Sequence, residues 1–148
     1  MMLHYGLDDG KRWHEPEIYY KPKFIDKYHC SVYDPNYISW VGEIDKKDIM
    51  AYFKKEKKKF DAITKIRSNK ALYIPQKKDK FIETPTLMDF CDLIYSSSEL
   101  YCLTTGTAPL AAAMGKSATV MYGKNHSDGN LVSRHHTYIL IDRCLRNK

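Results

Sequence analysis

Residues 96–123 constrain the fold more than any other part of the chain, because they have the pattern of a strand, a polar turn, a short helix, a second turn and a second strand. The apolar runs 100–103 and 118–122 are the expected strands. The helix between them, about 108–114, consists mostly of small residues, which let it lie close against a sheet. The segment therefore predicts an α/β domain in which two strands are joined by a helical crossover.

The turn before this helix is rich in hydroxyl side chains, and it consists of Thr104, Thr105, Gly106 and Thr107. At a helix N-terminus the first backbone N–H groups have no partner within the helix, and the helix dipole is positive there. Both features favour an anion such as a phosphate. Because ligands of open α/β sheets bind at the carboxyl ends of the strands, we expect an anionic ligand at this turn.

The rest of the chain alternates between strand-like and helix-like segments. The expected strands are 29–33, 37–41, 71–74 and 137–141, and the expected helices are about 46–66 and 86–96. The second of these helices opens on a capping box, with a hydroxyl at Thr86 and an acid at Asp89. This alternation predicts a Rossmann-like three-layer α/β domain with a mainly parallel sheet over residues 24–148, preceded by an irregular N-terminal arm, 1–23.

The segment 46–66 is strongly basic and accounts for much of the net charge of +6. Seven lysines lie between positions 46 and 59, and apolar residues recur among them at helical spacing. We expect a surface helix with its lysines in solvent and with Ile49, Phe53, Phe60 and Ile63 buried. Three interpretations of such a lysine-rich face stay open: a solvated surface, a contact for an anionic membrane, or a contact for nucleic acid.

Several common motifs are absent. Gly115-Lys116-Ser117 is not a P-loop, because Leu110 stands where the first glycine is required, and Gly115 is better explained as a helix C-cap. The histidines and cysteines lack metal-ligand spacing, so a metal site is not expected. No cofactor is expected either. No apolar stretch approaches 18 residues, and the scattered cysteines favour a cytoplasmic protein.

Four motifs follow one another over residues 84–123: the helix start Pro85-Thr86-Leu87-Met88-Asp89, the turn Thr105-Gly106, the run Ala111-Ala112-Ala113-Met114-Gly115 and the strand end Tyr122-Gly123. With these motifs the segment resembles the C-terminal, donor-binding half of GT-B glycosyltransferases, most closely the ADP-heptose:lipopolysaccharide heptosyltransferase-like family. The chain departs from the family at two positions, since Thr104 replaces its aspartate and Pro109 replaces its histidine. Pro109 suits the first helical turn, where an N–H is not needed.

The resemblance implies that the turn at Thr104, Thr105, Gly106 and Thr107 holds the diphosphate of a nucleotide-sugar donor. We expect Thr84, Thr86, Lys124 and His126 on the rim of that site. The family also has an acceptor-binding half that usually supplies the catalytic base. The resemblance therefore implies a partner subunit or domain for the acceptor, and no catalytic residue is assigned in this chain.

The leading hypothesis is a glycosyltransferase-like domain that binds a nucleotide-diphosphate sugar and transfers the sugar to a cell-surface glycan or glycolipid, as in lipopolysaccharide biosynthesis. Loss of the family's aspartate and histidine leaves open a non-catalytic binding module. The lysine-rich segment leaves open a nucleic-acid binder or a protein that contacts the anionic inner face of the membrane.

Overall fold

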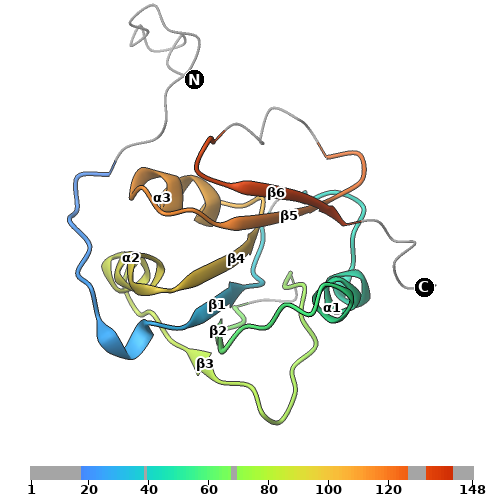
Figure 1. The fold of residues 1–148 in the computed structure, drawn as a ribbon, viewed down its shortest axis with the longest axis horizontal. Coiled ribbons are helices and arrows are strands. Elements are labelled where there is room, and N and C mark those ends of the chain that lie inside the picture. The colour runs from blue at the N-terminus through green and yellow to red at the C-terminus, as the bar shows by residue number, and fades with distance from the viewer. Residues whose placement is uncertain (1–17, 39, 68–69, 127–132, 142–148) are drawn as a thin grey trace, which may run out of the picture.

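The computed structural model describes residues 18–38, 40–67, 70–126 and 133–141. In this part of the chain six parallel strands form one sheet in the order β3-β2-β1-β4-β5-β6 (Figure 1). The strands are β1 (Ser31–Asp34), β2 (Ala62–Thr64), β3 (Phe81–Ile82), β4 (Glu99–Leu103), β5 (Thr119–Gly123) and β6 (Thr137–Ile141). This order is that of the Rossmann fold, so the predicted fold class is confirmed.

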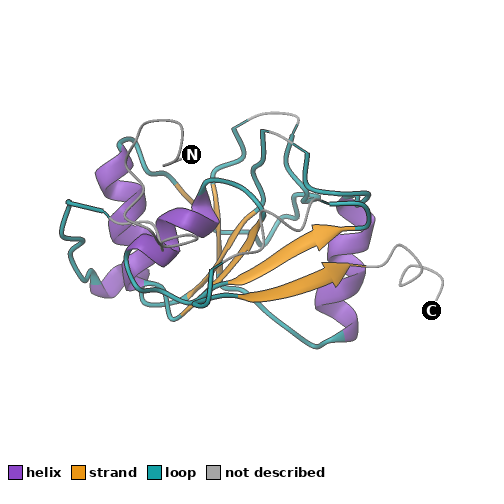
Figure 2. Cartoon of the chain, turned by 90° about the horizontal axis from the view of Figure 1, so that it is seen from above, coloured by secondary structure: helices purple, strands orange, loops and turns teal. Residues whose placement is uncertain are grey.

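Helices cover both faces of the sheet and make a three-layer domain. The helix α1 (Lys46–Lys55) lies on one face, and α2 (Leu87–Ser96) and α3 (Thr107–Ala113) lie on the other (Figures 1 and 2). Each face has its own buried cluster, because successive side chains of a strand point to opposite sides. Val32 belongs to the cluster under α2 and α3, and its neighbour Tyr33 belongs to the cluster under α1.

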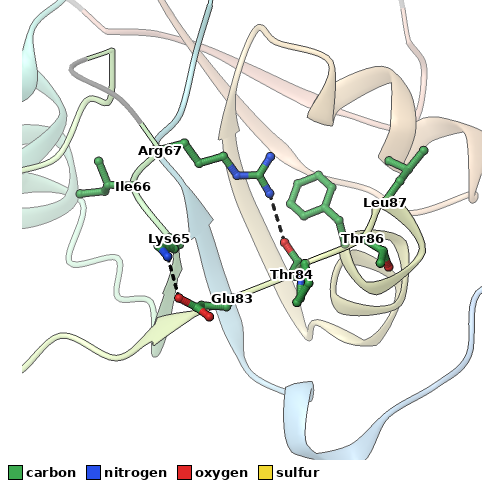
Figure 3. A pocket seen from close by; sticks show the side chains of 9 residues that line it. Lys65, Ile66, Arg67, Glu83, Thr84, Thr86 and Leu87 are labelled. Atoms are coloured by element: carbon green, nitrogen blue, oxygen red, sulfur yellow. Dashed lines mark hydrogen bonds and ion pairs between the residues drawn. The ribbon is translucent and has the colours of Figure 1, made fainter.

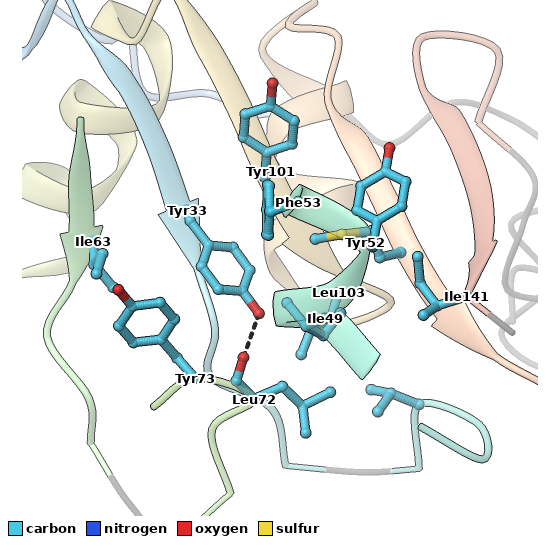
Figure 4. Close-up of a cluster of buried hydrophobic side chains, with 12 residues drawn as sticks. Tyr33, Ile49, Tyr52, Phe53, Ile63, Leu72, Tyr73, Tyr101, Leu103 and Ile141 are labelled. Carbon is cyan, nitrogen blue, oxygen red and sulfur yellow. Dashed lines mark hydrogen bonds between the residues drawn. The ribbon is translucent and has the colours of Figure 1, made fainter. Parts of the chain in front are cut away.

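Tyr33 is the centre of the cluster under α1 (Figure 4). Its ring packs edge-on against Phe53 and Tyr73, and its hydroxyl donates to the carbonyl of Leu72 at 2.7 Å. Burial raises the pKa of this hydroxyl far above its ordinary value, so it remains a donor. The contact explains why residues 71–73 are buried although they belong to no strand.

The predicted strand at 71–74 is therefore wrong, since this segment joins only one isolated antiparallel bridge, between Ala71 and Asn36. The predicted strand at 37–41 is wrong as well. Its last residue, Val41, accepts a hydrogen bond from the end of β5, and residues 37–40 form no strand among the positions described. Val41 and residues 71–73 are buried although neither segment is a strand, and an apolar pattern does not distinguish such coil from a strand.

The predicted helix at 46–66 is correct only as far as Lys55. Lys57 takes a left-handed conformation with φ +52°, and Lys57 and Lys58 donate back to Lys54 and Phe53 in a Schellman motif. The chain then enters β2, so Ile63 is buried in a strand and not in the helix. The predicted exposure of all seven lysines is confirmed, and so is burial of Ile49 and Phe53, while Phe60 is half-buried.

The segment with the strongest sequence signals folds as predicted. The strands β4 and β5 are parallel and joined by α3, and α2 begins with the capping box of Thr86 and Asp89. Gly115 ends α3 at φ +70°, with Gly115 and Lys116 donating to Ala112 and Ala111. The expected strands 29–33 and 137–141 correspond to β1 and β6.

The N-terminal arm is described only from residue 18 onward, and residues 1–17 of this prediction lie outside the described part. Its last residues lie against α2, where the hydroxyl of Tyr20 and the amide of Lys23 both donate to Asp92. Among the residues described, no helix is long and apolar enough to span a membrane.

Candidate functional site

A pocket of about 650 Å³ lies where β1 and β4 end. In a sheet of this strand order, β1 and β4 are the neighbours whose connections leave in opposite directions, and ligands bind in the crevice at this point. The pocket walls come from β1 and β2 and the connections after them, from α2, and from α3 with the turn before it. The lining residues are Asp34, Asn36, Tyr37, Ile38, Thr64, Arg67, Leu87, Phe90, Thr105, Gly106, Thr107 and Leu110.

Asp34 is the buried polar centre of this pocket, with 4% of its surface exposed. The hydroxyl of Thr64 donates to its Oδ1 at 2.7 Å, and the hydroxyl of Thr107 donates to its Oδ2 at 2.5 Å. The side-chain amide of Asn36 donates to Oδ1 at 3.1 Å. The carboxylate therefore joins β1, β2 and α3, and its oxygens already accept protein hydrogen bonds, as a buried charge requires.

Asn36 extends this network to Arg67. Its side-chain oxygen accepts the Arg67 backbone N–H at 3.0 Å, and its side-chain amide donates to the Lys65 carbonyl at 3.0 Å. The guanidinium of Arg67 then donates to the hydroxyl of Thr84 at 3.2 Å and lies over the ring of Phe90 at 5.8 Å. These contacts hold an arginine, the only cation among the described lining residues, at the edge of the pocket.

A second pocket of about 610 Å³ adjoins the first and shares Arg67, Leu87 and Phe90 with it (Figure 3). Its lining also includes Thr84 and Thr86, which the sequence predicted on the rim of the site. The two pockets together follow the carboxyl ends of β3, β2, β1 and β4.

The Lys65–Glu83 ion pair borders this second pocket at 2.7 Å, and the hydrogen bond and charge of Lys65 lower the pKa of the Glu83 carboxyl. We expect Lys65→Gln to raise the pKa of Glu83 toward its ordinary value, measured by NMR titration of the side-chain carboxyl carbon. Because the folded pKa is the lower one, the pair stabilises the fold above the unfolded pKa and loses this effect as the pH falls through the folded pKa. An unchanged pKa of Glu83 in the variant would contradict this account.

The turn before α3 offers fewer free amides than the sequence suggested. Thr105 donates its N–H to Leu103 at 2.8 Å, Ala108 donates to the Thr105 carbonyl at 3.1 Å, and Thr107 donates to the Thr105 hydroxyl at 3.4 Å. Pro109 has no N–H. An anion at this turn therefore depends on a side-chain cation, and Arg67 is the cation that the pocket provides.

Five of the eight predicted site residues line the two pockets. Thr105, Gly106 and Thr107 line the first pocket, and Thr84 and Thr86 line the second. The remaining three lie toward β5. The hydroxyl of Thr104 is 2.9 Å from Nε2 of the buried His126, and Lys124 is exposed beside its bridge to Glu43.

The structure adds Asp34, Asn36, Thr64 and Arg67 to the residues found by sequence reasoning. One available signal was the position of Asp34 directly after a predicted strand, whose carboxyl end meets that of β4 in a parallel sheet. No group of three or more histidine, cysteine, aspartate or glutamate side chains with metal-binding geometry occurs within the described ranges.

Comparisons of the chain with known protein families, with curated proteins and with solved structures gave no match. The choice of function therefore depends on the geometry of the pocket and on the resemblance carried by residues 84–123.

Proposed function

We propose that this chain is the donor-binding half of a GT-B-type glycosyltransferase, and that it holds a nucleoside diphosphate sugar in the pocket where β1 and β4 end. The observation that carries the proposal is a pocket of about 650 Å³ at the switch point of a 3-2-1-4-5-6 parallel sheet. This volume falls in the range that small-molecule and cofactor sites occupy.

Charge and shape support a diphosphate in this position. The guanidinium of Arg67 presents a fork of N–H donors that fits phosphate oxygens. Gly106 lines the pocket and faces open space, since a Cβ atom at this position would have no neighbour within 4 Å. A phosphate can therefore approach the backbone at Gly106 while Arg67 neutralises its charge.

Binding without turnover is a second candidate, and the state of Asp34 favours it. Asp34 is the only carboxylate among the described residues that line the pocket, and its oxygens accept hydrogen bonds from Thr64 and Thr107. Because these hydrogen bonds tie it to β2 and α3, we assign Asp34 a positioning role and not that of the general base. Transfer of the sugar then requires an acceptor site and a base from a partner subunit or domain.

The test is calorimetric titration of the chain with UDP- and ADP-sugars, followed by an assay for release of the nucleotide with and without a candidate partner. We expect Arg67→Gln to weaken donor binding by about 10- to 100-fold, the range for loss of a hydrogen bond to a charged group. We expect Gly106→Val to weaken binding comparably, because the added side chain fills the pocket while φ −56° suits any residue.

Lys27→Gln is the matched control for Arg67→Gln, because it removes one positive charge at a residue that precedes the amino end of β1. It should change donor affinity less than two-fold. Equal losses of donor affinity in Arg67→Gln and Lys27→Gln would mean that only the net charge of the protein matters. Absence of binding to the unaltered chain at millimolar donor would contradict the proposal, and binding without nucleotide release would favour the non-catalytic candidate.

A further inference from the structure

A basic hollow of about 1150 Å³ lies where the chain enters β2 and β3, at the end of these strands away from the donor pocket. Two segments form it, the end of α1 with the turn that follows, and the connection that leads to β3. Its cations are Lys54, Lys57, Lys58, Lys59, Lys78 and Lys80. We name these six residues the lysine ring.

The hollow contains little negative charge, and its carboxylates already accept hydrogen bonds. Its two acids are Asp61 and Asp79. Asp61 accepts the backbone N–H of Ser31 at 3.0 Å, and Asp79 accepts the hydroxyl of Tyr73 at 2.7 Å and the backbone N–H of Gln76. Within the described residues no ammonium of the lysine ring is paired with a carboxylate. Six lysines thus line the hollow with little compensating negative charge, which favours an anionic ligand.

The backbone at Lys57 gives an independent reason to look for a function here. Lys57 occupies the left-handed C′ position of the Schellman motif at φ +52°, where glycine or asparagine is the favoured residue. A lysine in this conformation is strained, and such strain recurs at functional sites. The strained residue supplies one member of the lysine ring.

The chemistry of the lining selects phosphate groups and does not select bases. All of its cations are lysines, which bind phosphate as point charges and lack the planar fork of arginine. The aromatic residues of the lining are Phe53 and Tyr73, which are buried, and Phe60, which is half-buried, so the hollow offers little aromatic face on which a base could stack.

We propose that the lysine ring binds a multiply charged phosphate group, supplied either by a free polyphosphate or by the headgroup of a phosphorylated lipid. The proposal is independent of the donor pocket, because the two sites share no lining residue. Arg67→Gln, which is expected to weaken donor binding, should leave this second site unchanged.

The first arm of the test titrates the chain with inorganic tripolyphosphate at low salt. Lys58→Gln/Lys80→Gln removes one lysine from each segment, and we expect it to weaken binding by about 25-fold, or about five-fold for each lysine near an anionic surface. The matched control is Lys46→Gln/Lys47→Gln, which removes the same charge from the opposite end of α1, outside the hollow. This control should change affinity less than two-fold.

The second arm measures sedimentation with vesicles that contain phosphatidic acid, and with vesicles of equal surface charge that contain phosphatidylglycerol. A loss of binding in Lys58→Gln/Lys80→Gln that is absent from Lys46→Gln/Lys47→Gln supports the proposal in either arm. The arm in which this loss appears identifies the source of the phosphate. Binding in neither arm overturns the proposal, and so do equal losses in the two double variants. An oligonucleotide that binds at least ten-fold more tightly than tripolyphosphate would assign the surface to nucleic acid and overturn it as well.

Lys57→Gly separates binding from folding. Glycine relieves the strain at φ +52°, so we expect the melting temperature to rise by about 3 °C. Removal of one member of the lysine ring should weaken tripolyphosphate binding by about five-fold in the same protein. A more stable variant with unchanged affinity would contradict the role of Lys57 in the site.

Discussion

Gly42→Ala is expected to destabilise the fold by about 3 kcal/mol, since it combines backbone strain with a steric clash. Gly42 has φ +97°, a conformation that residues with a Cβ atom rarely adopt. A Cβ atom there would lie 2.3 Å from the carbonyl oxygen of Gly123, and this neighbour is backbone that cannot turn aside. Urea unfolding followed by circular dichroism measures the loss.

The close approach of Gly42 and Gly123 fixes the connection after β1 against the end of β5. The Gly123 N–H donates to the Val41 carbonyl at 2.8 Å, and the Glu43 N–H donates to the Lys124 carbonyl at 2.8 Å. An added side chain on either glycine would separate these pairs. Gly123→Ala should therefore reproduce the loss, because its Cβ would lie 2.6 Å from the backbone of Glu43.

Gly106→Ala is the matched control for the glycine prediction. Its dihedral angles suit alanine and its Cβ would meet no atom within 4 Å, so the stability should change by no more than about 0.5 kcal/mol. If Gly42→Ala costs no more than this control, the connection after β1 does not depend on the close approach.

The sequence predicted residues 84–123 well because their signals are local. A capping box, a run of small residues and a glycine at the helix end each act within a few positions, and they specify α2, α3 and the neighbouring strands. A parallel connection through a helix then follows from chain geometry.

Residues 37–82 were predicted poorly because their structure depends on distant partners. Ala62 and Ile63 become β2 because they pair with β1 on one side and β3 on the other. Their apolar spacing also fitted a helix, so the pattern alone favoured the continuation of α1. The strand β3 has only two residues, too few for a periodic signal.

The candidate site was predicted in part for the same reason. Thr105, Gly106 and Thr107 stood out locally at the start of a helix, whereas the contact between Thr107 and Asp34 joins positions 73 residues apart. Arg67 was not predicted, because the expected helix extended to residue 66. In the structure β2 ends at Thr64, and the connection after it brings Arg67 to the pocket.

Asp34→Ala is expected to cost about 3 kcal/mol, because it leaves buried hydroxyls without an acceptor. Thr64 and Thr107 are buried, with 2% and 7% of each residue exposed, and both of their hydroxyls donate to this carboxylate. The exposed Asp26 provides the control, and Asp26→Ala should change stability by no more than about 0.5 kcal/mol. Chemical unfolding measures both variants.

A double-mutant cycle with Thr107→Val tests whether the cost comes from the unsatisfied hydroxyl. Valine has nearly the shape of threonine but no hydroxyl, so in the Asp34→Ala background it removes a buried group that has lost its acceptor. The double variant should therefore be more stable than the two single losses predict together, with a coupling of about 1 kcal/mol. Additive losses would mean that Asp34 acts through packing alone. Coupled losses would mean that the hydrogen bond between β1 and the start of α3 holds the turn at Gly106 in place. The same variants should then weaken the proposed donor binding, while Asp26→Ala should not.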